Sequence, residues 1–66
     1  MKNNFAKNLC TLRRQKKWRQ IDLAARLNTT QRKVSYWEKG KFEPDIDTIL
    51  ALSELFDVSL EELLTD

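Results

Sequence analysis

Glycine and proline are almost absent from this chain. Its 66 residues include one glycine, Gly40, and one proline, Pro44. Tight β-hairpins depend on pairs such as Asn-Gly or Asp-Gly, and neither pair occurs. A chain so poor in turn residues is expected to form helices joined by short connections. Its length is that of one domain, near the lower limit for folding without a disulfide or a metal.

Apolar residues recur at helical spacing along the whole chain. Phe5, Leu9 and Leu12 show the pattern at i, i+4 and i+7, and Ile46, Ile49 and Leu50 begin a similar stripe. We therefore predict an all-α fold, a compact globule of five short helices at about residues 4–17, 20–27, 31–39, 44–56 and 59–64.

Three polar residues stand where these helices would begin. Thr30 and Asp45 are suitable N-caps for the third and fourth helices. Ser59 and Glu62 have the S-x-x-E spacing of a capping box, which predicts the start of the fifth helix. The neighbouring pair Asp45 and Asp47 is explained by the start of a helix, so we expect no metal site there.

Charge is divided sharply along the sequence. All 12 lysines and arginines lie between Lys2 and Lys41, where the acidic residues are Asp22 and Glu38 only. The segment 42–66 holds the other eight acids and no basic residue. A basic field of this strength favours a polyanionic partner, with nucleic acid the leading candidate. Two solvated faces that attract each other would give the same pattern.

The predicted third helix has a polar face suited to DNA. At 100° per residue, Val34, Trp37 and Glu38 fall on the inner side of this helix. The outward side chains are Gln31, Arg32, Ser35, Tyr36 and Lys39. Glutamine pairs with adenine and arginine with guanine in the major groove. The alternative for this helix by itself is an ordinary solvated face.

Several other function classes lack the residues that they need. Histidine is absent and Cys10 is the single cysteine, so an internal disulfide and a Cys/His zinc site are excluded. There is no nucleophile paired with a base and no glycine-rich phosphate loop, so we expect neither an enzyme nor a cofactor. The longest apolar run, Ile49 to Leu52, has four residues, which predicts no membrane span and an intracellular, cytoplasmic protein.

The stretch from Gln20 to Gly40 resembles the helix-turn-helix of the phage repressor and Cro family, also called the XRE family. The resemblance is carried by Gln20, Ala24, the turn at Asn28, Val34, the run Trp37-Glu38-Lys39-Gly40, and Pro44. It extends over nearly the whole chain, from about Phe5 to Leu64. It implies one lambda-repressor-like DNA-binding domain over residues 1–66, with its motif at about 20–40.

This resemblance also implies a function and a partner. A protein of this family is expected to regulate transcription, here as a repressor that binds double-stranded DNA as a dimer on a partly palindromic operator. The base-reading positions would be Gln31, Arg32 and Tyr36, with Lys33 and Ser35 at the margins. Phosphate contacts would come from Arg13, Arg19, Gln20, Lys39 and Lys41. Arg13 and Glu38 also match a pair that forms an internal salt bridge in some members. Such a pair would hold the first helix against the third and steady the arginine for a phosphate; the alternative is an internal brace with no role at DNA.

Four positions depart from the family pattern. Members often have glycine where Asn28 stands, and again near Lys17 and Asp57, and a left-handed backbone is costly for lysine. Arg19 stands where a serine or threonine usually caps the second helix, and it is a poor N-cap. We interpret Arg19 as a phosphate contact. Phe42 could pack against the core or touch the DNA backbone.

The C-terminal helices, at residues 45–64, are expected to form the dimer interface. So small a domain is not expected to bury all the apolar residues near its C-terminus, which are Val58, Leu60, Leu63 and Leu64. The alternative function is a protein-interaction module of the same fold, such as an antitoxin that binds a toxin. A controller of a restriction–modification operon is another variant, and an antirepressor is a possible partner.

Overall fold

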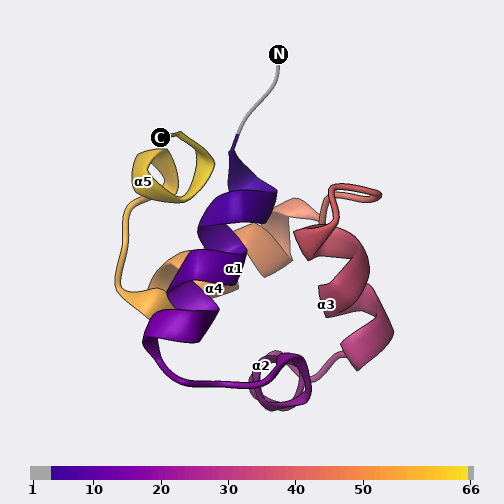
Figure 1. Cartoon of the computed structure of the whole chain (residues 1–66). Coiled ribbons are helices and arrows are strands. Elements are labelled where there is room, and N and C mark those ends of the chain that lie inside the picture. The colour runs from indigo at the N-terminus through magenta and orange to yellow at the C-terminus, as the bar shows by residue number, and fades with distance from the viewer. Residues whose placement is uncertain (1–3, 66) are drawn as a thin grey trace.

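The computed structural model describes residues 4–65 and forms five α-helices there, with no strand. Their bounds are α1 (Phe5–Gln15), α2 (Gln20–Arg26), α3 (Gln31–Glu38), α4 (Ile46–Phe56) and α5 (Leu60–Leu64). Figure 1 shows α1 and α4 crossing the centre of the molecule, with α2, α3 and α5 around them. The all-α prediction is confirmed, and each helix end lies within two residues of its predicted place.

Side-chain caps begin three of the helices. Thr30, Asp45 and Ser59 each accept a hydrogen bond from the backbone N–H three residues later, at 3.2, 2.9 and 3.0 Å. Glu62 completes a capping box, because its carboxylate accepts the backbone N–H of Ser59 at 3.0 Å. These contacts satisfy N–H groups that have no partner within the helix, and they confirm the predicted starts.

Left-handed backbone conformations join the helices. Lys17, Asn28 and Asp57 have φ angles of 61°, 56° and 55°, and Gly40 has 74°. The resemblance places a frequent glycine at Asn28 and others near Lys17 and Asp57. Asparagine and aspartate tolerate this region better than other side chains, whereas lysine gains nothing from it. The loop after α1 is therefore a point of local strain.

The core receives side chains from all five helices. Its buried apolar members are Phe5, Leu9, Leu23, Ala24, Val34, Trp37, Leu52, Phe56 and Leu63. The partly buried Trp18 packs against this core, with its ring centroid 5.7 Å from that of Phe56. Ile46 and Leu50 differ from the predicted stripe, because they are 63% and 44% exposed.

The short helix α5 is held against the N-terminal end of α1. The backbone N–H of Asn4 donates to the Leu64 carbonyl at 3.1 Å, and Asn8 Nδ2 donates to the Leu63 carbonyl at 2.9 Å. These bonds satisfy carbonyls at the end of a five-residue helix that would be marginal by itself. Within residues 4–65, no helix is long and apolar enough to cross a membrane.

Candidate nucleic-acid interface

Helices α2 and α3 form a compact pair joined by a four-residue connection. Asn28 takes the left-handed conformation, and the backbone N–H of Thr29 donates to the Ala24 carbonyl at 2.9 Å, which closes the end of α2. Leu23, Ala24 and Val34 are buried in the core that lies under both helices. This arrangement is a helix-turn-helix, and it fixes the direction in which α3 presents its outer face.

The outer face of α3 is polar and accessible. Gln31, Arg32 and Lys33 are exposed at the N-terminal end, while Ser35 and Tyr36 are half-buried further along. Val34 and Trp37 are buried on the opposite side, as the helical wheel predicts. Lys39 and Lys41 follow the helix and are exposed. The structure therefore brings the five predicted base-reading residues onto one helix, with basic side chains beside them.

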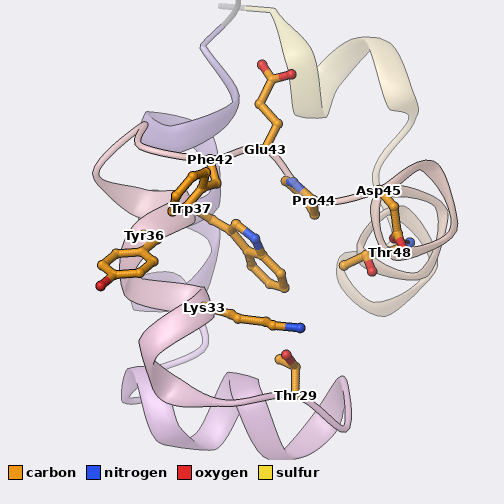
Figure 2. A pocket seen from close by; sticks show the side chains of 9 residues that line it. All are labelled: Thr29, Lys33, Tyr36, Trp37, Phe42, Glu43, Pro44, Asp45 and Thr48. Carbon is orange, nitrogen blue, oxygen red and sulfur yellow. Dashed lines mark hydrogen bonds between the residues drawn. The ribbon is translucent and has the colours of Figure 1, made fainter.

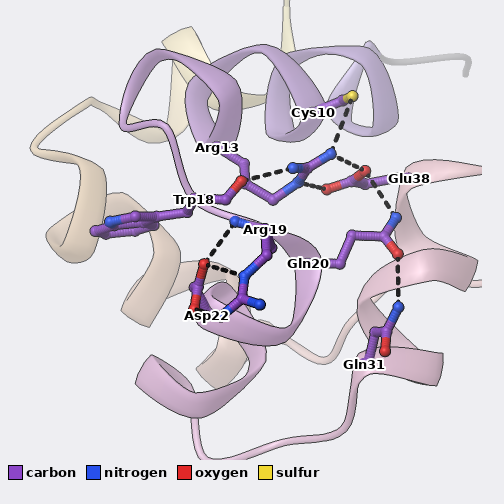
Figure 3. A network of polar contacts seen from close by, with 8 residues as sticks. All are labelled: Cys10, Arg13, Trp18, Arg19, Gln20, Asp22, Gln31 and Glu38. Carbon is purple, nitrogen blue, oxygen red and sulfur yellow. Dashed lines mark hydrogen bonds and ion pairs between the residues drawn. The ribbon is translucent and has the colours of Figure 1, made fainter.

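A network of polar contacts ties this helix to α1 and α2 (Figure 3). Arg13 Nε donates to Glu38 Oε2 at 2.7 Å, and Arg13 Nη2 donates to Glu38 Oε1 at 3.1 Å. Arg13 Nη1 donates to the Trp18 carbonyl at 2.7 Å. Arg13 is only 9% exposed. Since its guanidinium is committed to these internal acceptors, the geometry favours the internal brace over a phosphate contact.

Gln20 and Gln31 extend the network to the N-terminal end of α3. Gln20 Nε2 donates to Glu38 Oε1 at 3.1 Å, and Gln31 Nε2 donates to Gln20 Oε1 at 3.4 Å. The amide nitrogen of Gln20 is thus used internally, and its backbone N–H lies at the start of α2, where anions are favoured. The second bond is long, and it sets the orientation of the exposed Gln31 side chain.

The Glu38 carboxylate stays ionised through its partners. Burial acts to raise its pKa, but hydrogen bonds from Arg13 and Gln20 and the charge of Arg13 outweigh this and lower the pKa below its ordinary value. The pKa of Arg13 is raised, chiefly by its hydrogen bonds to Glu38. The brace between α1 and α3 is therefore a charged pair under physiological conditions.

Arg19, the predicted phosphate contact, is held by Asp22 of the same helix. Asp22 Oδ2 accepts from the backbone N–H of Arg19 at 2.7 Å, and the Arg19 guanidinium contacts the same carboxylate at 3.2 and 3.1 Å. These hydrogen bonds lower the pKa of Asp22. The Arg19 side chain is 80% exposed, so it is accessible to a phosphate in exchange for Asp22. This pair was not predicted from the sequence, although the Arg19–Asp22 spacing of three residues could have indicated it.

A hollow of about 270 Å³ separates α3 from the start of α4 (Figure 2). Lys33 extends across it toward Asp45, whose pKa is lowered, first by its hydrogen bonds to Thr48 and also by the Lys33 charge. Trp37 and Pro44 line its inner wall. Lys33 is thus exposed, but its ammonium group lies toward α4, which agrees with its marginal place among the base-reading positions.

The predicted dimer residues do not share one environment. Leu63 is fully buried within the chain, so its side chain is unavailable to a partner, and this part of the prediction is wrong. The cause is the docking of α5 onto α1, which the apolar pattern of α5 does not show. Leu60 is 37% exposed, while Val58 and Leu64 are half-buried. In the part of the chain that the structure describes, no group of three or more potential metal ligands occurs.

The chain matches a protein family of known fold. A family model described as helix-turn-helix matches residues 11–63. An uncharacterised HTH-type transcriptional regulator of Bacillus subtilis, YqaE, is 40% identical over 60 residues. The HTH-type transcriptional activator BcrR of Enterococcus faecalis is 34% identical over 61 residues. These alignments cover 91% and 92% of this chain but only 52% and 30% of the two relatives.

Solved structures give the same result. A transcriptional regulator from Listeria innocua is 31% identical with a TM-score of 0.91, over 97% of this chain and 60% of that one. The P22 c2 repressor, solved in complex with a synthetic operator, is 28% identical with a TM-score of 0.84, over 91% of each chain. The resemblance noted in the sequence is confirmed, and the four proteins named here are described as transcriptional regulators, an activator or a repressor.

Proposed function

This chain belongs to the helix-turn-helix family of the phage repressor and Cro type, and from that premise we propose that it binds double-stranded DNA sequence-specifically through α3. In this proposal α3 lies in the major groove, with Gln31 and Arg32 over base edges and Tyr36 further along. Ser35 and Lys33 contribute at the margins. The single domain over residues 1–66 is then the DNA-binding unit.

The observation that carries this proposal is the composition of the exposed face of α3. Gln31 and Arg32 are both exposed to solvent. Glutamine and arginine are side chains that can form bidentate hydrogen bonds with purine edges. Gln31 Nε2 also donates to Gln20 Oε1 at 3.4 Å, a contact that favours one orientation of the Gln31 amide. An oriented glutamine is useful where the position of the amide matters.

Phosphate contacts are assigned to the basic residues around α3. Arg19 lies at the start of α2, and Lys39 and Lys41 follow the end of α3. Together with the backbone N–H of Gln20, they would hold the backbone on both sides of the groove. The acidic residues of α4 and α5 would be repelled by phosphate, so these two helices would face away from the DNA.

We further propose that the protein is a repressor that acts as a dimer. Repression by occupying a promoter requires no surface beyond the DNA-binding one, whereas activation needs a contact with the polymerase. Leu60, with Val58 and Leu64, would form the two-fold interface, so that two α3 helices meet a partly palindromic operator. A protein that binds an operator must have access to the DNA, so we expect it in the cytoplasm.

Selection from a random duplex library at about 0.15 M salt tests this proposal. We expect enrichment of an inverted repeat whose half-site centres are about one helical turn apart. The logarithm of affinity for the selected site should fall with the logarithm of salt, by about 0.9 for each phosphate neutralised. If no sequence is enriched and binding shows no salt dependence, the proposal fails and a protein partner becomes the next candidate.

A matched pair of variants separates base reading from phosphate binding. Arg32→Ala should lose on the order of 1–3 kcal/mol and relax preference at one base position. Lys41→Ala should weaken binding to all sequences about equally and reduce the salt slope by about 1. Uniform weakening by Arg32→Ala would instead assign Arg32 to the backbone.

A further inference from the structure

The segment that follows α3 carries an exposed aromatic side chain. Phe42 is 62% exposed, and its neighbours Lys41 and Glu43 are exposed as well. One exposed apolar residue is common on protein surfaces and means little by itself. What distinguishes Phe42 is its fixed place against α3.

A C-terminal capping motif sets that place. Gly40 has a φ of 74°, and its N–H donates to the Trp37 carbonyl at 3.2 Å. The N–H of Lys41 donates to the Tyr36 carbonyl at 3.0 Å. These two bonds form a Schellman motif, which ends the helix and turns the chain back along its last turn. Phe42 therefore returns to the side of α3 that carries Tyr36.

The rings of Tyr36 and Phe42 pack edge to face. Their centroids lie 5.4 Å apart with an interplanar angle of 64°, a preferred geometry for aromatic pairs. Figure 2 shows the two rings together, with the Tyr36 hydroxyl pointing away from Trp37. Lys41 Nζ lies 5.6 Å from the centroid of the Tyr36 ring. An ordered apolar surface is thus flanked by a cation next to the base-reading face.

We propose that this aromatic pair, Tyr36 and Phe42, contacts the 5-methyl group of a thymine, and that Phe42 thereby determines specificity at one operator position. The thymine methyl is the apolar group that a base edge presents in the major groove, and phenylalanine is among the side chains that contact it. Lys41 would bind a phosphate beside that base. This inference rests on the proposed function, because it needs α3 in the groove.

Uracil scanning of the selected operator tests the inference. Each thymine is replaced in turn by uracil, which removes the methyl group and leaves the hydrogen-bonding edge unchanged. For the wild-type chain we expect one position at which affinity falls about fourfold, the effect of burying one methyl group. We expect Phe42→Ala to bind the unmodified operator more weakly than the wild type does. Replacing the sensitive thymine by uracil should then cause no further loss of affinity for this variant.

Two further variants complete the experiment. Ile46→Ala removes an apolar side chain of similar exposure, 63%, from α4 and should behave as the wild type. Phe42→Leu keeps an apolar surface and should retain part of the preference for thymine. Because Phe42 and Ile46 lie outside the buried core, each variant should still fold, and circular dichroism checks this.

The inference is overturned if uracil has no effect at any position, or if Phe42→Ala loses as much as the wild type at the sensitive one. Both outcomes leave the proposed function intact, since the operator is still bound. If the wild-type chain selects no DNA sequence, the proposed function and this inference fail together.

Discussion

Glu38 at the end of α3 accepts two hydrogen bonds from the Arg13 guanidinium of α1, at 2.7 and 3.1 Å, in a pair nearly closed to solvent. The two side chains are 7% and 11% exposed. Both charges have been removed from water, so each depends on the other for its stabilisation. The pair fixes α3, the helix proposed to face the DNA, against α1.

Glu38→Gln should destabilise the fold by on the order of 3 kcal/mol, because it leaves the Arg13 charge buried without its counter-ion. Urea unfolding followed by circular dichroism measures this change. Glu54→Gln, at an exposed position on α4, is the control and should change stability by less than about 0.5 kcal/mol. Equal effects of the two substitutions would show that the Arg13–Glu38 pair contributes no net stability.

The same pair predicts a pH dependence of stability. The pKa of Glu38 is lower in the folded chain than in the unfolded chain, so the unfolded state binds more protons in the interval between the two values. The stabilisation is complete above the unfolded pKa and is lost as pH falls through the folded one. Thermal unfolding from neutral to acidic pH should show a steeper loss for the wild type than for Glu38→Gln. Asp22 and Asp45 also have lowered pKa values, but both remain in the two chains and contribute equally. Parallel curves would therefore show that Glu38 does not contribute to the pH dependence.

The sequence predicts the parts of this structure that local chemistry decides. The caps at Thr30, Asp45 and Ser59 were expected, because a short oxygen-bearing side chain before an apolar run satisfies free N–H groups. The buried positions Val34 and Trp37 were also expected, since helical periodicity alone separates the two faces of α3.

Long-range packing explains what the sequence did not predict. Asn8 binds carbonyls at the end of α5, more than fifty residues away, and this docking buries Leu63. Ile46 and Leu50 share the helical spacing of core residues and yet are exposed, because α4 turns Leu52 and Phe56 toward the core instead. The Gln20–Gln31 contact likewise depends on how α2 and α3 approach each other.

Lys17→Gly should stabilise the chain by about 1 kcal/mol. Lys17 has a φ of 61°, a conformation that is costly for a side chain without a local hydrogen bond and free for glycine. Chemical unfolding of the variant measures the gain. Lys16→Gly is the control, because Lys16 has a right-handed backbone at the end of α1 and should lose stability. A loss at both positions would show that chain entropy outweighs the strain at Lys17.

Arg19→Thr should change stability and DNA affinity in opposite directions. Threonine supplies the oxygen that caps α2, and with Asp22 it would complete a capping box, so the unfolding temperature should rise. The loss of a cation at the start of α2 should weaken binding and reduce the salt slope by about 1. Arg19→Lys should keep the slope without improving the cap. If Arg19→Thr leaves affinity and slope unchanged, Arg19 is not a phosphate contact.

Salt should act on dimerisation and on DNA binding with opposite signs. The proposed interface at Leu60 lies beside Glu61 and Glu62, so a two-fold contact brings like charges together, and added salt should screen their repulsion. Sedimentation equilibrium without DNA should be run at about 0.05 and 0.5 M salt. We expect a smaller dissociation constant of the dimer at the higher salt concentration. Leu60→Ser should weaken the dimer, whereas Ile46→Ser, at a more exposed position on α4, should not. A wild-type chain that stays monomeric at high micromolar concentration at both salt levels would refute the interface for the free protein.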